Sequence, residues 1–283
     1  KETRAKEEAL LDPERAPETA EEFERLVMES PHSSFIWIKY MAFHLEMTEI
    51  DKAREIAQRA LKSISFREEQ EKLNVWVARL NLENMYGSKE AVMECFEEAC
   101  RVNDAKKMHF QLLSIFEKND EPQVTEQFFK TMTRKYRPSC KVWLRYCQFK
   151  LSGSHPEAIS RVLERGLEAI PKRKHVKLIS KVALLEYKSG SAERGNTLME
   201  GVVSTYPKRI DLWSVYIDME VKAGNLNTAR RLFDRVLTLK LRARQAKFFF
   251  KKYLELEKAH GSAETVGTVK EKARAWVEAN AAS

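Results

Sequence analysis

Basic side chains recur in three short segments of the back half of the chain, where they could bind phosphate groups. The segments begin at residues 172, 208 and 242, which are 36 and 34 positions apart. Lys and Arg neutralise phosphates and release counterions without reading base edges, so they suit contacts that ignore sequence. The candidate RNA-phosphate contacts are Lys172, Arg173, Lys174, Lys208, Arg209, Arg242 and Arg244, joined by Lys247, Lys251 and Lys252 from the aromatic stretch that follows.

The distribution of charge along the chain favours an anionic partner for these segments. The net charge is +8. Residues 1–140 contain 22 Lys and Arg against 27 Asp and Glu, whereas residues 141–283 contain 28 against 15. This asymmetry indicates that the back half meets either RNA or an acidic protein. The alternative is that the segments are ordinary helix ends, because cations are mildly favourable near helix C-termini.

Phe248, Phe249 and Phe250 stand among the last of these lysines and allow two interpretations. An exposed ring beside cations could stack on a base of a nucleic acid. The alternative is that the rings are core, because helices inside a repeat array are packed on both flanks. Three consecutive residues cover most of the circumference of a helix, so we expect one of the three rings to point outward.

Other residues that could do chemistry do not form a recognisable catalytic or metal site. A glutamate recurs at one position in five of the seven repeats, whereas catalytic groups gather in one local constellation. The six histidines lack metal-site spacing, and no phosphate-binding loop or nucleophile motif occurs. The spacing of the four cysteines fits neither a zinc-binding motif nor a disulfide within a straight helix. It therefore predicts buried free thiols and a reducing compartment. We therefore predict no enzyme activity, no cofactor and no metal. The cysteines are Cys95, Cys100, Cys140 and Cys147.

Helices must position the basic segments, and an apolar anchor recurs through the chain with helical companions. The anchors are Trp37, Trp76, Phe110, Trp143, Ile179, Trp213 and Phe250, at intervals of 33 to 39 residues. Three residues later stand Tyr40, Arg79, Leu113, Tyr146, Val182, Tyr216 and Tyr253. Seven residues later stand His44, Glu83, Glu117, Lys150, Glu186, Glu220 and Glu257. Offsets of three and seven share one helical face, and a period near 35 residues is typical of stacked helix pairs.

A second helix with small and apolar residues follows each anchor helix, most clearly through Ala53, Ile56, Ala57 and Ala60. Glycines fall between the helices of a pair, where a helix end often adopts the left-handed conformation, and prolines fall between pairs. The sequence predicts an all-α, right-handed superhelical solenoid of six pairs plus an N-terminal half repeat. It occupies residues 18–283 behind a charged linker at 1–17, and the start without methionine suggests a fragment of a longer protein. No apolar run is long enough to span a membrane.

The pattern Trp-x-x-Tyr with Glu four residues further resembles the HAT (half-a-tetratricopeptide) repeat. Trp213, Tyr216 and Glu220 match all three positions, and Ala53 and Arg54 match the start of its second helix. In the repeat of Trp76 and Glu83, Arg79 replaces the tyrosine, so that match is partial. HAT proteins are concentrated in RNA-processing assemblies, and the resemblance implies a binding role there.

Longer stretches are similar to the HAT-repeat domain at the C-terminal end of a family of ribosomal RNA-processing proteins. The resemblance covers nearly the whole chain and is carried by residues 34–44, 73–84, 206–219 and 247–253. It implies a non-catalytic scaffold for ribosome biogenesis in the nucleolus, within the small-subunit processome. Expected partners are other ribosome-assembly proteins and pre-rRNA, with no membrane and no small-molecule substrate. Two alternatives remain: a scaffold that contacts proteins alone, and a HAT subunit of a splicing or polyadenylation complex.

Overall fold

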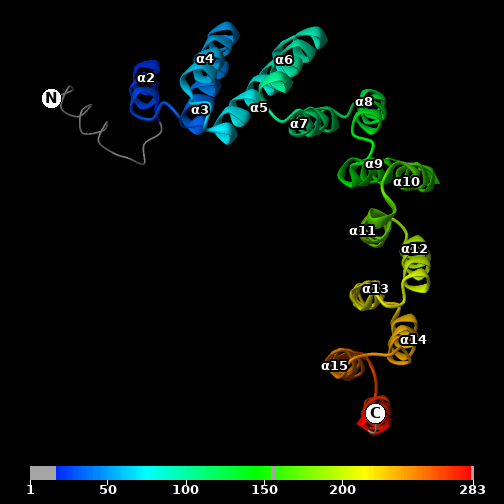
Figure 1. The fold of residues 1–283 in the computed structure, drawn as a ribbon. Coiled ribbons are helices and arrows are strands. Elements are labelled where there is room, and N and C mark those ends of the chain that lie inside the picture. Colours follow the sequence, from blue (N-terminus) through cyan, green and yellow to red (C-terminus); the bar gives the residue numbers. More distant parts are fainter. Residues whose placement is uncertain (1–16, 154–156, 282–283) are drawn as a thin grey trace, which may run out of the picture. The chain divides into compact units, whose positions relative to one another are not determined.

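The chain folds into α-helices joined by short turns, and Figure 1 traces them in order. The computed structural model describes residues 17–153 and 157–281, and these ranges contain no strand. The predicted all-helical repeat class is confirmed, whereas the predicted linker lies outside the described residues except for residue 17. The helices are α2 (Ala20–Glu29), α3 (Ser34–Glu46), α4 (Ile50–Ser63), α5 (Glu69–Tyr86), α6 (Lys89–Val102), α7 (Ala105–Lys118), α8 (Pro122–Lys135), α9 (Cys140–Ser152), α10 (Glu157–Ala169), η1 (Lys172–Lys174, a 3-10 turn), α11 (His175–Ser189), α12 (Ala192–Thr205), α13 (Ile210–Lys222), α14 (Leu226–Leu237), α15 (Ala243–His260) and α16 (Ala263–Ala281).

The described residues form seven helix pairs, from α3–α4 to α15–α16, with α2 as the preceding half repeat. The expected number of six pairs was wrong by one. Six second helices carry the recurring pattern, but α16 does not, and Val269 is its one side chain in the buried core. The small and apolar pattern that marks the other second helices is missing from α16, so the sequence pattern gave one pair too few. The right-handed sense of the superhelix stays a prediction.

Contacts divide the chain into two compact units. Unit 1 comprises residues 1–132 and unit 2 comprises residues 133–283, with the boundary inside α8. Within unit 2 the first helices α9, α11, α13 and α15 lie on one side and the second helices α10, α12 and α14 on the other (Figure 1). The turns between consecutive pairs therefore recur in equivalent positions of this unit.

Eleven of the predicted anchors and their companions are buried in the core of the repeats: Trp37, Tyr40, Trp76, Glu83, Trp143, Tyr146, Glu186, Trp213, Tyr216, Glu220 and Tyr253. The anchors Phe110, Ile179 and Phe250 are partly buried. In three pairs the indole N–H also donates to a carbonyl six residues earlier, in the turn that precedes the helix. The donor–acceptor pairs are Trp37–Pro31 (2.9 Å), Trp143–Arg137 (2.8 Å) and Trp213–Pro207 (3.0 Å). Because a buried indole N–H needs an acceptor, each anchor fixes the turn between two pairs.

An arginine covers the tryptophan ring and is held there by a carboxylate. The Arg235 guanidinium lies 5.2 Å from the Trp213 ring and donates to both oxygens of Glu200 at 2.9 Å. This bidentate geometry holds the cation over the ring, where the quadrupole of the aromatic face attracts it. The same arrangement is formed in the first pair by Arg59, Trp37 and Glu24.

In the second pair the cation over the tryptophan ring comes from another position of the repeat. Arg79 stands where four of the other pairs have tyrosine, 5.3 Å from the Trp76 ring, and donates to Glu98 at 2.9 Å. Glu98 stands 22 residues after the tryptophan, the position that Arg59 has after Trp37. The replacement of tyrosine that made this repeat an incomplete match therefore preserves the cation over the ring.

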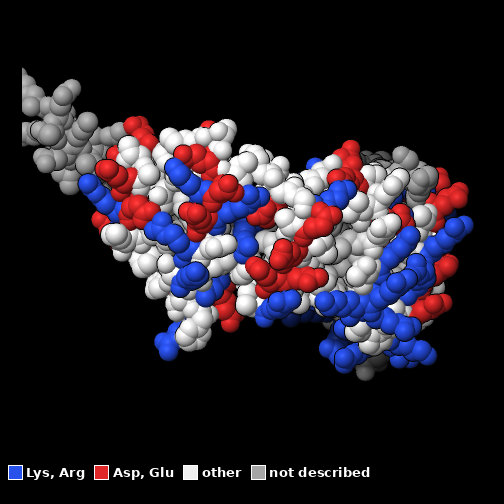
Figure 2. Space-filling model, turned by 90° about the horizontal axis from the view of Figure 1, so that it is seen from above, with Lys and Arg blue, Asp and Glu red and all other residues white. Residues whose placement is uncertain are grey.

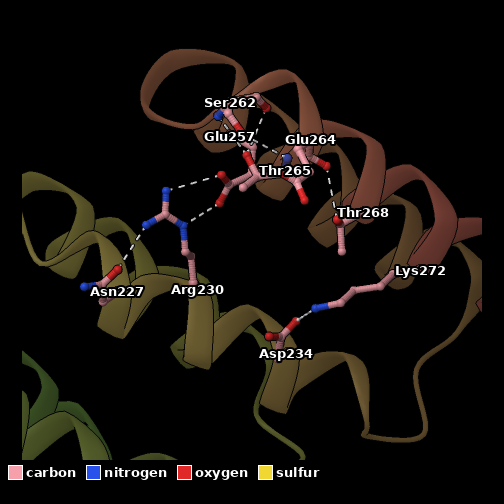
Figure 3. Close-up of polar contacts among 9 residues, drawn as sticks. All are labelled: Asn227, Arg230, Asp234, Glu257, Ser262, Glu264, Thr265, Thr268 and Lys272. Atoms are coloured by element: carbon pink, nitrogen blue, oxygen red, sulfur yellow. Dashed lines mark hydrogen bonds and ion pairs between the residues drawn. The ribbon is translucent and has the colours of Figure 1, made fainter.

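Two of the recurring glutamates, Glu83 and Glu257, connect one repeat to the next. Arg54 of α4 donates to both oxygens of Glu83 in α5, and Arg230 of α14 does the same to Glu257 in α15 (Figure 3). Each pair thus links the second helix of one repeat to the first helix of the next. Lys272 of α16 also donates to Asp234 of α14 at 2.6 Å, and this contact is drawn in Figure 3.

These glutamates also explain most of the glycines inside pairs. A β-carbon at Gly87, Gly190 or Gly261 would collide with the carboxylate of the glutamate four residues earlier. The expected left-handed conformation occurs among these turn glycines at Gly224 alone, whose φ is +80°. Close approach of a side chain, and not backbone freedom, is therefore the usual requirement for glycine here.

The carboxylates that accept from arginine should make the fold sensitive to acid. Hydrogen bonds from Arg59, Arg235 and Arg230 lower the pKa values of Glu24, Glu200 and Glu257 below the ordinary 4.5. A lowered pKa in the folded state means that the stabilisation is present above pH 4.5 and is lost as the pH falls through the folded value. We expect the melting temperature, followed by circular dichroism, to be flat from pH 7 to about 5 and to fall below about 4.5. A melting temperature unchanged down to about pH 3 would contradict this.

Candidate nucleic-acid interface

The three predicted basic segments occupy equivalent turns of unit 2. Lys172–Lys174 form η1 between α10 and α11, residues 208 and 209 lie between α12 and α13, and residues 242 and 244 lie at the start of α15. The Lys174 ammonium donates to the carbonyl of Pro138, in the turn one repeat earlier, at 3.4 Å. This contact joins two consecutive turns along one edge. Since packed helices lie about 8–10 Å apart, three such turns span roughly 20 Å.

Five of the predicted side chains in these turns are exposed and have no ion-pair partner within the described residues. They are Lys172, Arg173, Lys208, Arg242 and Arg244. Arg209 differs, because it forms a bidentate ion pair with Asp211 at 2.9 and 2.7 Å. Lys174 is partly buried and serves the contact with Pro138. Arg209 and Lys174 are thus less available to a phosphate than their neighbours.

The three predicted lysines of α15 have three different roles. Lys247 is exposed without an ion-pair partner in the described chain, and Lys251 makes a 3.9 Å pair with Glu255 in which both side chains are well exposed. Lys252 is bound to both oxygens of Asp218 at 2.8 Å and to Ser214 at 2.9 Å, on α13. It links two repeats, and we leave it out of the proposed phosphate contacts.

Sequence reasoning missed three exposed lysines near this edge. Lys240 lies in the turn between α14 and α15, where it adds a third cation to Arg242 and Arg244. Lys177 and Lys181 lie four residues apart on α11, and the buried residues Leu178 and Val182 follow them directly. The spacing of four on the polar face was the signal that could have found the α11 pair.

The two units differ in the sign of their net charge. Unit 1 has 19 Lys and Arg against 27 Asp and Glu, and unit 2 has 31 against 15. On the face drawn in Figure 2, Lys and Arg gather in the part at the right, whereas both signs are mixed at the left. A surface with so large a positive excess attracts polyanions over about a Debye length, roughly 8 Å at physiological salt.

The three phenylalanines of α15 point in different directions. Phe249 is fully buried, Phe250 is partly buried against Trp276, and Phe248 is 46% exposed. One ring of the three therefore faces outward, as the helical geometry predicts. Its surroundings are basic, because Arg244, Lys247 and Lys251 are its exposed neighbours on the helix.

Unit 1 offers a surface of a different kind. A groove of about 490 Å³ runs over α3, α5 and α7, and none of the residues that line it is charged. Ile38, Leu45, Val77 and Met85 supply apolar walls. Of the eleven large apolar side chains that are exposed in the described residues, eight lie in unit 1. Exposed apolar surface of this kind is typical of contacts with proteins.

Two further properties concern the described residues. The four cysteines are free, with Cys95 and Cys147 buried, and burial raises the pKa of each of these two thiols to about 12. In the described ranges no helix is long and apolar enough to cross a membrane, and no three His, Cys, Asp or Glu side chains come together as metal ligands.

Stacked helix pairs with exposed turns define the class of helical-repeat binding proteins. Residues 28–282 match the family described as "Pre-mRNA-splicing factor Syf1/CRNKL1 C-terminal HAT repeat", and the chain belongs to this HAT-repeat family. A solved tetratricopeptide repeat protein from Parabacteroides merdae aligns with a TM-score of 0.37 and 12% identity, over 86% of this chain and 93% of its own.

Relatives with a much higher identity are named for ribosomal RNA. "Protein RRP5 homolog" of Mus musculus is 50% identical over 98% of this chain, and "rRNA biogenesis protein RRP5" of Arabidopsis thaliana is 46% identical over 100%. The resemblance to a ribosomal RNA-processing family is thereby confirmed. The chain spans 15% of the length of each of these two relatives.

Proposed function

We propose that the chain is a non-catalytic scaffold in ribosome biogenesis, which supports pre-rRNA processing and early small-subunit assembly. One observation carries the RNA part of this proposal: the row of equivalent basic turns in unit 2, whose exposed cations have no ion-pair partners in the described chain. The relatives named for rRNA biogenesis supply the process in which such a surface would act. Because pre-rRNA is made in the nucleolus, we propose that location for the chain.

The two units suit two kinds of partner. The cations of unit 2 would contact phosphates of pre-rRNA, largely without regard to sequence. The uncharged groove of unit 1 would hold segments of other ribosome-assembly proteins. Neither surface requires a cofactor or a small-molecule substrate.

A second candidate is a HAT-repeat scaffold in a splicing or polyadenylation complex, and the description of the matching family favours it. The relatives at 46–50% identity favour ribosome assembly instead. Crosslinking of the protein to RNA in cells separates the two. Recovery of pre-rRNA supports the first candidate, whereas recovery of pre-mRNA or spliceosomal RNA supports the second.

Reversing three free cations should weaken RNA binding strongly. For Lys172→Glu, Arg173→Glu and Lys208→Glu together, we expect about 100-fold weaker binding of a mixed-sequence single-stranded oligoribonucleotide at 0.1 M salt, since each lost contact costs roughly fivefold. The slope of log Kd against log salt should fall by about 2. Fluorescence anisotropy over a salt series measures both quantities.

The matched control places three reversals on exposed lysines of unit 1: Lys62→Glu, Lys107→Glu and Lys118→Glu. It changes the net charge equally and should leave the salt slope nearly unchanged. Both variants should keep the helical circular dichroism spectrum, because the altered side chains are exposed. Equal losses in the two variants would show that the net charge attracts RNA without a defined surface. Undiminished affinity in the unit 2 variant would leave a scaffold that contacts proteins alone.

A further inference from the structure

We propose that Phe248 is a stacking platform for a base of single-stranded RNA. This inference rests on the proposed binding of RNA by the basic turns of unit 2, and it adds the kind of RNA that they take. Phe248 is a large ring that is nearly half exposed in the unit with the positive excess. In the described part of that unit, Tyr206 is the other aromatic side chain with so exposed a ring, and it stands two residues before Lys208.

The Phe248 ring is held in place and still open to a ligand. It makes a T-shaped contact with Phe249, with ring centroids 5.3 Å apart. The Lys252 ammonium lies 5.1 Å from the ring centroid, and Asp218 and Ser214 of α13 hold that ammonium. The ring is therefore braced by two elements, and it loses little side-chain freedom when a ligand binds.

The chemistry around the ring fits a nucleotide. Arg244 precedes Phe248 by four residues and Lys251 follows it by three, so the three side chains form one row along α15. A base stacked on the open part of the ring would place its flanking phosphates beside these cations. Stacking on an aromatic face accepts every base, which agrees with contacts that do not read sequence.

The same geometry discriminates between single-stranded and duplex RNA. In a duplex the base faces are covered by neighbouring pairs, and the minor groove offers hydroxyl groups and phosphates. A duplex could meet the cations but not the ring, unless a base leaves the helix at a cost. Loss of the ring should therefore weaken binding of single strands and leave binding of duplexes unchanged.

The test compares Phe248→Ala and Phe248→Trp with the parent 283-residue chain. The probes are a mixed-sequence oligoribonucleotide of roughly 16 nucleotides, the duplex of the same sequence, and an abasic strand of equal length. We expect Phe248→Ala to bind the single strand about 5- to 100-fold more weakly, with unchanged affinity for the duplex and the abasic strand. Its salt slope should stay that of the parent, since no charge is lost. Phe248→Trp should retain affinity and show fluorescence quenching by the single strand beyond that of the parent.

The matched control is Phe35→Ala in unit 1. Phe35 is also exposed, with the Lys39 ammonium 4.5 Å from its ring and four residues along the helix, but its unit lacks the positive excess. It should leave binding of all three probes unchanged. Equal losses of single-strand and abasic binding in Phe248→Ala, or no loss at all, would overturn the platform.

The outcome for the platform can be separated from that of the proposed RNA role. If the triple reversal of Lys172, Arg173 and Lys208 removes RNA binding while Phe248→Ala does not, the basic turns bind RNA and the platform is wrong. If the triple reversal also has no effect, the RNA role of unit 2 fails as well.

Discussion

Replacing Trp213 with alanine should lower the free energy of unfolding by about 3–5 kcal/mol, because truncation of a buried ring of this size leaves a cavity. The loss includes more than apolar contact. The indole also donates to the Pro207 carbonyl and supports Arg235, which binds Glu200. We expect urea denaturation followed by circular dichroism to show the loss, with hydrogen exchange locating it in unit 2.

Trp213→Phe is the matched control, because it keeps an aromatic ring and removes the N–H donor. It should cost about 1–2 kcal/mol, from the turn carbonyl that loses its partner and from the reduced volume. If Trp213→Ala has the stability of the parent chain, the anchor position is not the core of its repeat.

Arg230→Leu is the second large change, with an expected loss of about 2–3 kcal/mol. Glu257 is 2% exposed, so removal of its cation leaves a buried carboxylate with too few donors. The cost is below that of a fully buried pair, because Arg230 itself is partly exposed. Chemical denaturation of the variant measures the loss.

Two further variants show whether the buried charge is responsible. Arg230→Leu combined with Glu257→Gln should recover part of the loss, because the amide needs no cation. Arg209→Leu removes an arginine from an exposed ion pair and should cost about 0.5 kcal/mol or less. If adding Glu257→Gln to Arg230→Leu lowers the free energy of unfolding as much as Glu257→Gln does alone, the two residues do not act as a pair.

The helical class and the anchors could be predicted because the residues that become buried recur in the sequence with a fixed period. Trp37, Trp143 and Trp213 are each followed by Tyr three residues later, and one helical face carries both. The count of pairs was one too low, although Phe250 marks the first helix of the last pair, because α16 lacks the small and apolar pattern of the other second helices. The partners of the glutamates also escaped, because Arg54 and Glu83 are 29 residues apart and only the stacking brings them together.

The basic edge was predictable in outline and not in its details. Turns at equivalent places could be read from the period, and their cations are exposed. Which cation is free depends on neighbours that periodicity does not show. Asp211 forms an ion pair with Arg209, and Asp218 of the preceding repeat forms one with Lys252. Phe248 could be expected to face outward only as one of three rings, since the choice depends on how α15 packs.

The paired positions of Arg79 and Glu98 limit how single residues can be moved between the repeats of this protein. If the second pair received a tyrosine in place of Arg79, as in the first pair, while Glu98 stayed in place, the Trp76 ring would lose its cation. Glu98 would lose the donor that Arg79 supplies. Residues 79 and 98 therefore have to be substituted together when one repeat is rebuilt on the sequence of another.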